Sequence, residues 1–347
     1  MTTFPSINEK WSQFSSDSTV EHWWKRAVGS AVSWLSQNHS GVSEWMSWMT
    51  KHRDHMIQQT WESSIPADYR PGLTYVVLGS GGRNEDLLGS DFDYAVLLDP
   101  RLDMAKVAPY LEGYTARMHD MGFPLCKGFV LGTNPRWIGT RNEWQQRIDS
   151  YFAFPDWENA RYLFILLDGR PLCGINNGFC DGGDWGGILN RTRRGISESP
   201  FICWEMAHLG IHKTVAVNRF GRIRSEKGQR RVTVNVKEGL LNPIIHSMRL
   251  LAVVHQCGGL STLDRLEELV SIGIVEASFA VRLEAALEFG WRLRLKQQIE
   301  DFQRQTATSD QIFVNDLDSA SLEKLTIHLE TAKELERWTH RSFPKPR

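Results

Sequence analysis

Residues 75–98 read YVVLGSGGRNEDLLGSDFDYAVLL, in which two apolar runs lie on either side of a glycine-rich centre. The first run, Tyr75 to Leu78, is short, apolar and partly β-branched, and glycines follow it directly, so it is predicted to be a buried strand. A second strand is predicted at Phe92 to Leu98, and a helical turn or two at Asn84 to Leu88. The segment therefore predicts a strand, a glycine turn and a second strand.

Two acidic residues, Asp91 and Asp93, lie at the start of the second run. Side chains alternate between the two faces of a strand, so both carboxylates are expected to leave the same face. Mg²⁺ commonly takes one or two protein carboxylates and fills its other positions with water and substrate phosphate. Two such ions, about 3.5–4 Å apart, can bind the attacking and leaving oxygens of an in-line displacement. The acids therefore predict phosphoryl or nucleotidyl transfer with Mg²⁺ or Mn²⁺.

The glycine-rich turn is predicted to hold the phosphates of a nucleotide. Successive backbone N–H groups form anion-binding sites, and glycine lets the main chain approach a ligand closely. The residues expected to bind nucleotide here are Gly79, Ser80, Gly81, Gly82 and Ser90. Arg83 is expected to stabilise charge on the leaving pyrophosphate, and its structural alternative is an ion pair with Glu85 or Asp86. No Lys followed by Ser or Thr comes after the glycines, which excludes a Walker-type loop.

The joint pattern of strand, Gly-Ser, Gly-Arg and Ser-Asp-x-Asp resembles the active-site signature of the polymerase-β-like nucleotidyltransferase superfamily. Within it, the chain is most similar to the nucleotidyltransferases commonly fused to CBS and cyclic-nucleotide-binding domains, which are related to the nitrogen-regulatory protein uridylyltransferases. Four later segments match in the same order: PLCKG at 124–128, NPRW at 134–137, LDGRP at 167–171 and NVKEGL at 235–240. The resemblance covers roughly residues 20–340.

The resemblance implies a third metal-binding carboxylate on a later strand. The matching strand is expected at residues 125–131, which contain no acid, and Cys126 and Lys127 stand in that region instead. Asp168 is the substitute candidate for the third metal ligand. The alternative for Asp168 is a salt bridge to Arg170 or to a neighbouring arginine.

The resemblance also gives a role to Lys237, which is implied to lie beside the nucleotide. Taken alone, this residue would be an ordinary exposed lysine.

The sequence predicts an α+β fold, with a small mixed-sheet nucleotidyltransferase domain flanked by an N-terminal helical pair and a C-terminal helical bundle. The expected division is an N-terminal helical segment at 1–70, the catalytic domain at 71–175 and a helical substrate-binding domain at 176–347.

Apolar residues at helical spacing predict most of the chain outside the sheet to be helical. The predicted helices are Val20 to Leu35, Val42 to Thr60, Met104 to Met118, Trp144 to Phe152, an element from Ala160 to Leu167, Phe201 to Val217, Pro243 to Cys257, Ser261 to Ser271, Ala277 to Phe302 and Ser319 to Trp338. The glycine-rich residues 174–187 are expected to be a flexible loop at the domain boundary. The tryptophans of the first two helices predict either a core or a surface that binds a partner.

Composition sets limits on the partners and the compartment. The formal net charge is −1, so attraction to RNA must come from a local patch. Arg219 to Arg231 is such a patch, predicted either to contact triphosphate or RNA or to be a solvated turn. Five cysteines without paired spacing and a first segment unlike a signal peptide predict a reduced, cytoplasmic protein. No run approaches the ~20 apolar residues that span a membrane, so no membrane partner is expected.

Two hypotheses follow. In the first, the chain transfers an NMP from an NTP such as ATP to an acceptor and releases pyrophosphate. By kinship the acceptor is a protein regulated by adenylylation or uridylylation, which would place the chain in signal transduction, and RNA, a small molecule or a second nucleotide are the alternatives. In the second, the site is catalytically degraded and the chain senses nucleotide as a regulatory protein.

Overall fold

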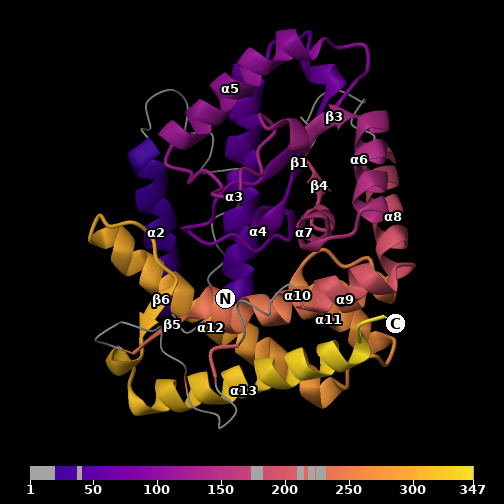
Figure 1. Cartoon of the computed structure of the whole chain (residues 1–347). Helices are drawn as coiled ribbons and strands as arrows, with labels where there is room; N and C mark the ends of the chain where they lie inside the picture. Colours follow the sequence, from indigo (N-terminus) through magenta and orange to yellow (C-terminus); the bar gives the residue numbers. More distant parts are fainter. Residues whose placement is uncertain are drawn as a thin grey trace.

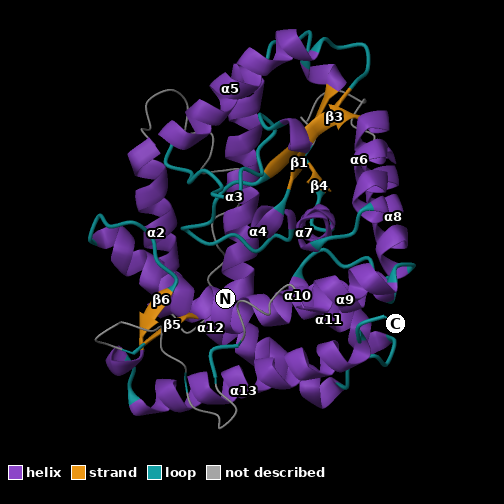
Figure 2. Cartoon of the chain, in the orientation of Figure 1, coloured by secondary structure: helices purple, strands orange, loops and turns teal. Residues whose placement is uncertain are grey.

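The computed structural model describes residues 20–36, 41–172, 183–208, 215–217, 223 and 232–346. These residues form an α+β fold in which a small mixed sheet lies among helices (Figures 1 and 2). The sheet lies in the upper half of Figure 1, and most of the helices from α9 onward lie below it. The predicted α+β class is confirmed, and the division at residues 70 and 175 stays a prediction.

The central sheet has four strands in the order β3-β2-β1-β4. Their bounds are Leu73–Val77 (β1), Tyr94–Leu98 (β2), Ile138–Thr140 (β3) and Arg170–Pro171 (β4). β1 pairs antiparallel with β2 and β4, and β2 runs parallel to β3. The two strands predicted around the glycine turn are present. Because β2 begins at Tyr94, however, Asp91 and Asp93 precede the strand instead of lying on it.

Each face of the sheet packs against its own hydrophobic core. Tyr75 and Val77 of β1 belong to one core, and Val76 and Leu78 belong to the other. A strand buried on both faces needs apolar residues at every position, which explains the unbroken apolar runs. The first core includes residues of α2 (Val20–Ser36), α3 (Val42–Ser64) and α5 (Met104–Asp120), and the second includes residues of α6 (Arg141–Ala153), α7 (Trp157–Leu166) and α8 (Gly183–Ser197).

Two predicted elements near the sheet are wrong. Residues 125–131 form turns instead of a strand, and only Leu125 makes a bridge, to Phe92. Phe129 has a φ of 54°, in the left-handed region, which interrupts the extended backbone that a strand needs. The helical turn lies at Gly79–Gly82 (α4), earlier than the predicted 84–88.

The N-terminal helices place their tryptophans in the core. The buried ones, each at most 8% exposed, are Trp23, Trp24, Trp34, Trp45 and Trp61. The indole Nε1–H of Trp24 donates to the carbonyl oxygen of Met121 at 2.8 Å, and its ring packs against Phe123. These side chains therefore join the helices to the sheet domain, and Trp11 lies outside the described residues.

The C-terminal half is mainly helical. Its described elements are α9 (Pro200–His208), β5 (Thr233–Asn235), the π-helix η5 (Lys237–Leu241), α10 (Asn242–Val254), α11 (Thr262–Ser271), α12 (Ala277–Gln303), β6 (Gln311–Phe313) and α13 (Ser319–Ser342). The short 3₁₀ helices among the described residues are η2 (Arg70–Gly72), η3 (Pro135–Trp137) and η6 (Val314–Asp316). β5 and β6 pair antiparallel. In α12, the Glu288 carboxylate accepts from the N–H groups of Val42 and Ser43, which joins this half to α3.

Three predictions for this half need correction or lie outside the described residues. The loop predicted at 174–187 is wrong from Gly183 onward, where α8 begins, and residues 173–182 are not described. The helix predicted to reach Val217 is wrong at residues 215–217, which are not helical. The basic segment 219–231 lies outside the described residues except for Ile223. Among the described helices, none combines the length and apolarity that crossing a membrane requires.

Candidate active site

Asp91 and Asp93 lie in the link before β2, with their carboxylates beside the thiol of Cys126. One ligand atom from each of the three residues lies within 4.8 Å of the other two. In the described part of the chain, no other three His, Cys, Asp or Glu side chains come together in this way. The structure therefore joins the two acids to a thiol, and the three residues are named here the Asp-Asp-Cys group.

Backbone hydrogen bonds hold Cys126 next to the acids. The N–H of Phe92 donates to the carbonyl oxygen of Pro124 at 3.3 Å, and the N–H of Tyr94 donates to that of Val130 at 3.0 Å. Residues 124–130 thus lie alongside the acidic link although they do not form a strand. Cys126 stands in the region where the superfamily resemblance placed a third acid, and no residue pattern around it indicates that its thiol would reach the carboxylates.

Burial and like charge make the Asp-Asp-Cys group electrostatically unfavourable by itself. The pKa of Asp93 is raised to about 7, first by burial and then by the charge of Asp91. A hydrogen bond from Cys126 and the charge of Lys237 act in the opposite direction. Oδ1 of Asp93 is buried and has no hydrogen-bond partner among the described residues. A buried carboxylate oxygen without a partner is costly, so these residues fit a divalent cation.

The thiol of Cys126 shares this environment. Its pKa is raised to about 12, first by burial and then by the negative charge of Asp93. The N–H of Gly128 donates to its sulfur at 3.3 Å. The thiol is therefore protonated in the absence of a cation, and it is oriented by its own turn.

The glycine turn begins where β1 ends and contacts Asp93 directly. Gly79 has a φ of +60°, and a Cβ there would lie 2.5 Å from Oδ2 of Asp93. Leu78 precedes the turn, and no side chain caps the first N–H groups of α4. These N–H groups have no partner within a helix, so they are available to bind an anion beside the carboxylates.

The two serine hydroxyls of the segment have partners within it. Oγ of Ser80 donates to Oδ1 of Asp86 at 2.9 Å. Oγ of Ser90 accepts from the N–H of Leu87 at 3.0 Å, and Ser90 is buried. Both hydroxyls therefore stabilise the loop between the turn and β2. A contact from Ser80 to phosphate would require its hydroxyl to leave Asp86.

Arg83 and Asp168 belong to a buried ion-pair cluster, named here the arginine cluster. Arg83 donates from Nε to Glu85 at 2.7 Å and from an η nitrogen to Asp168 at 2.6 Å. Asp168 also pairs with Arg249 at 2.8 Å and with Arg265 at 3.2 Å. Burial by itself would raise the pKa of Asp168. The three arginines lower the pKa by a larger amount, so the net shift is downward.

The arginine cluster matches the structural alternative for both residues. Asp168 is not a member of the Asp-Asp-Cys group, and its carboxylate is already balanced by guanidinium groups. Arg170, the neighbour considered as its partner, pairs with Asp54 at 2.8 Å instead. Arg83 is 8% exposed and directed at acids of the protein, so both its guanidinium group and the Asp168 carboxylate already have partners within the chain.

Helix α3 supports the loop with residues that sequence reasoning missed. Arg53 pairs with Asp86 at 2.6 Å and donates to the carbonyl oxygen of Asp91 at 3.1 Å. Arg53 is 2% exposed and lies four residues from both Met49 and Ile57 on the buried stripe of the helix. A cation within an apolar stripe was the available signal, because a buried charge requires a partner.

The C-terminal half borders the same loop. The N–H of Gly89 donates to Oε1 of Gln298 at 3.0 Å, and the N–H of Thr262 donates to Oε1 of Glu85 at 2.6 Å. Lys237 begins the π-helix η5, and its charge lowers the pKa of Asp93. The structure therefore places Lys237 within electrostatic range of the acids, and π-helical turns are frequent at functional sites.

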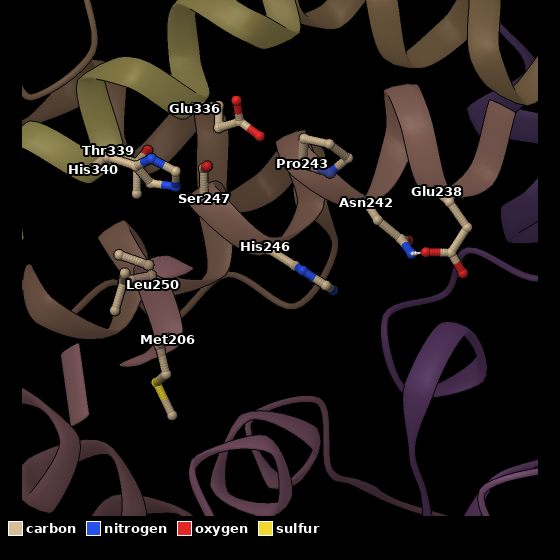
Figure 3. Close-up of a pocket in the computed structure, with 11 residues that line it drawn as sticks. Met206, Glu238, Asn242, Pro243, His246, Ser247, Leu250, Glu336, Thr339 and His340 are labelled. Atoms are coloured by element: carbon tan, nitrogen blue, oxygen red, sulfur yellow. Dashed lines mark hydrogen bonds between the residues drawn. The ribbon is translucent and has the colours of Figure 1, made fainter. Parts of the chain in front are cut away.

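A small cavity is lined in part by Glu238, the residue that follows Lys237. Figure 3 shows it between α9, the start of α10 and α13, with the hydrogen bond from Asn242 to Glu238 drawn as a dashed line. Its volume is about 50 Å³, which is room for only a few water molecules. It is too small for a nucleotide, so it is not the substrate site in this conformation.

Two family models match the chain. Residues 26–158 match the family described as Putative nucleotidyltransferase DUF294. Residues 201–343 match its companion, the Putative nucleotidyltransferase substrate binding domain. The chain belongs to this nucleotidyltransferase family. The first match contains the glycine turn and the Asp-Asp-Cys group, and the second contains Lys237. A search of the curated proteins found no match.

Proposed function

We propose that the chain is a metal-dependent nucleotidyltransferase that moves an NMP from an NTP such as ATP to an acceptor. The observation that carries the proposal is the convergence of Asp91 and Asp93 beside an uncapped glycine turn. Membership of the family supports nucleotidyl transfer in general. The unpartnered Oδ1 of Asp93 supports dependence on a divalent cation, which we assign as Mg²⁺ or Mn²⁺.

In the proposed reaction the acceptor oxygen forms a bond to the α-phosphorus while the bond to the β-phosphate oxygen breaks. The acceptor proton goes to solvent and pyrophosphate leaves. When bound, the cation would neutralise phosphate charge and orient the in-line displacement. Asp91 and Asp93 would hold it, the N–H groups of Gly79 to Gly81 would bind phosphate oxygens, and Lys237 would add positive charge near Asp93. The buried sheet behind the turn would hold these groups in fixed positions.

The protein acceptor is a proposal from kinship, and the cytoplasmic compartment is a proposal from the cysteine pattern and the first segment of the sequence. We retain a protein acceptor in the cytoplasm, modified by adenylylation or uridylylation, with RNA or a small molecule as alternatives. The segment proposed to contact RNA, Arg219 to Arg231, adds no argument because it is not among the described residues.

Labelled nucleotide tests the proposal. Each α-labelled NTP is incubated with Mg²⁺ or Mn²⁺ in cell lysate, and label is followed on protein, RNA and small products. The variant is the double substitution Asp91→Ala with Asp93→Ala, and the matched control is Asp99→Ala, an acid that follows β2 and pairs with Arg101. Transfer by the wild type and the control, but not by the double variant, is expected. Equal labelling by all three proteins would reject the proposal.

The absence of a third acid from the Asp-Asp-Cys group favours a second function, nucleotide sensing without transfer. Both functions require nucleotide binding, which raises the thermal midpoint by mass action. A midpoint raised by NTP, together with no labelled product for any nucleotide and cation, would support sensing. The intact acids and glycines argue for transfer.

A further inference from the structure

The third member of the Asp-Asp-Cys group is the thiol of Cys126, and sulfur and oxygen ligands prefer different cations. We propose that Cys126 binds the cation together with Asp91 and Asp93, and that its thiolate makes the centre prefer the borderline cation Zn²⁺ over the hard cation Mg²⁺. The inference rests on the proposed function and names the class of cation for that site. Thiolate ligands favour softer metals, whereas Mg²⁺ favours oxygen.

The fold directs the sulfur toward the acids. The N–H of Phe129 donates to the carbonyl oxygen of Cys126 at 3.0 Å, which closes a tight turn, and the N–H of Gly128 donates to the sulfur itself. Phe129 takes a left-handed backbone conformation in this turn although its side chain is 69% exposed. Non-glycine residues rarely adopt this conformation, and such positions are concentrated at ligand sites.

An independent observation shows that the acids lack a partner that a cation would supply. Oδ1 of Asp93 is buried and has no hydrogen-bond partner in the described part of the chain. Arg53 of α3 lies nearby, but it binds the backbone oxygen of Asp91 and the carboxylate of Asp86. The charge facing this group from the C-terminal half is that of Lys237. A cation bound to the Asp-Asp-Cys group would give Oδ1 of Asp93 a partner.

The alternative is that Cys126 has only a packing role. Cys203 is an example of such a cysteine in this protein: it is 5% exposed, and its thiol donates to the backbone oxygen of Ile196 at 3.2 Å. Cys126 is 9% exposed and lies against two carboxylates. When a cation binds, the thiol would release its proton to solvent, as metal-bound cysteines do. The two cysteines therefore form a matched pair for experiment.

Cobalt(II) titration of the full chain tests the sulfur ligand directly. Wild type and Cys203→Ser are expected to show a near-ultraviolet thiolate-to-cobalt charge-transfer band, and Cys126→Ser is expected to lack it. A band that is missing from the wild type, or that persists in Cys126→Ser, would overturn the proposal. This readout does not depend on activity, so a chain that shows the band but transfers no nucleotide would reject the proposed function and leave the ligand assignment standing.

Cation competition provides a second variant that keeps a ligand at the same position. Cys126→Asp restores a third carboxylate, and circular dichroism checks that the variant is folded. The ratio of Cd²⁺ to Mg²⁺ affinity, measured by equilibrium dialysis, is expected to fall at least about tenfold relative to wild type. The same ratio should be unchanged in Cys203→Ser. An unchanged ratio in Cys126→Asp would show that the sulfur does not bind the cation.

Discussion

A buried group and a half-buried group of acids lie at opposite ends of the glycine turn, and they differ in how their charge is balanced. A Cβ at Gly79 would meet the Asp93 carboxylate, and a Cβ at Gly82 would lie 2.0 Å from the backbone oxygen of Asp168. Asp168 has three guanidinium partners and a lowered pKa, whereas Asp93 has an unpartnered oxygen and a raised pKa. The first group is complete without a ligand and stabilises the fold. The second has an unpartnered carboxylate oxygen, which the proposed cation would bind.

The largest effect on stability is expected at the arginine cluster, in which the charge of Asp168 is balanced. Asp168→Asn removes the negative charge that three buried arginines share, and breaking a buried pair costs about 3–5 kcal/mol. Chemical denaturation should show a loss of this size. The control is Asp149→Asn, which breaks the exposed pair with Arg191 and should cost less than about 1 kcal/mol. Similar losses for both variants would remove the contrast between the two groups of acids.

The next effect concerns activity at the Asp-Asp-Cys group, in which Asp93 has an unpartnered oxygen. Asp93→Asn should lower transfer by more than about a hundredfold, because changes to residues that merely support a metal ligand already cost 10–100-fold. This corresponds to more than about 2.7 kcal/mol of transition-state stabilisation. Initial rates at saturating NTP give the measurement. Asp93→Asn retaining near wild-type rates would show that its carboxylate does not bind the cation.

A smaller effect is expected in the turn that joins the two groups. Gly82→Ala would bring a Cβ against the Asp168 backbone, and the shifts needed to relieve such overpacking typically cost about 1–3 kcal/mol. Gly113→Ala provides the control, since nothing lies within 4 Å of its added Cβ in the middle of α5. That control should gain up to about 1 kcal/mol. Equal thermal midpoints for the two variants would contradict the close packing.

The smallest effect, taken per pH unit, is the change of stability with pH in the absence of cation. The pKa of Asp93 is raised to about 7, so between about pH 4 and 7 the folded state holds a proton that the unfolded state has released. Stability should therefore fall as pH rises through this range, by less than about 1.4 kcal/mol per pH unit. Denaturation in chelator at several pH values measures the slope. Asp93→Asn should flatten it, whereas a slope unchanged by the substitution would place the titration elsewhere.

Several elements were predictable because their causes are local. The apolar runs of β1 and β2 and the glycines between them identify the strand, turn and strand, and the position of Asp91 two residues before Asp93 keeps the acids together. The prediction failed at residues 125–131, where apolar composition indicates a strand but a left-handed Phe129 makes a turn. It also failed at α8, because the glycines at its start favour a loop by propensity while burial of Trp185 and Ile188 favours a helix.

The sequence by itself determined the α+β class, the sheet buried on both faces and the presence of two acids beside a glycine turn, because these depend on neighbours along the chain. Only the tertiary structure decided which charges are balanced. Asp168 meets Arg83 and Arg265 across 85 and 97 residues, and Cys126 reaches the acids through a turn that has no strand pattern. Electrostatic partners depend on distance in space and on burial, and neither is encoded in the local sequence.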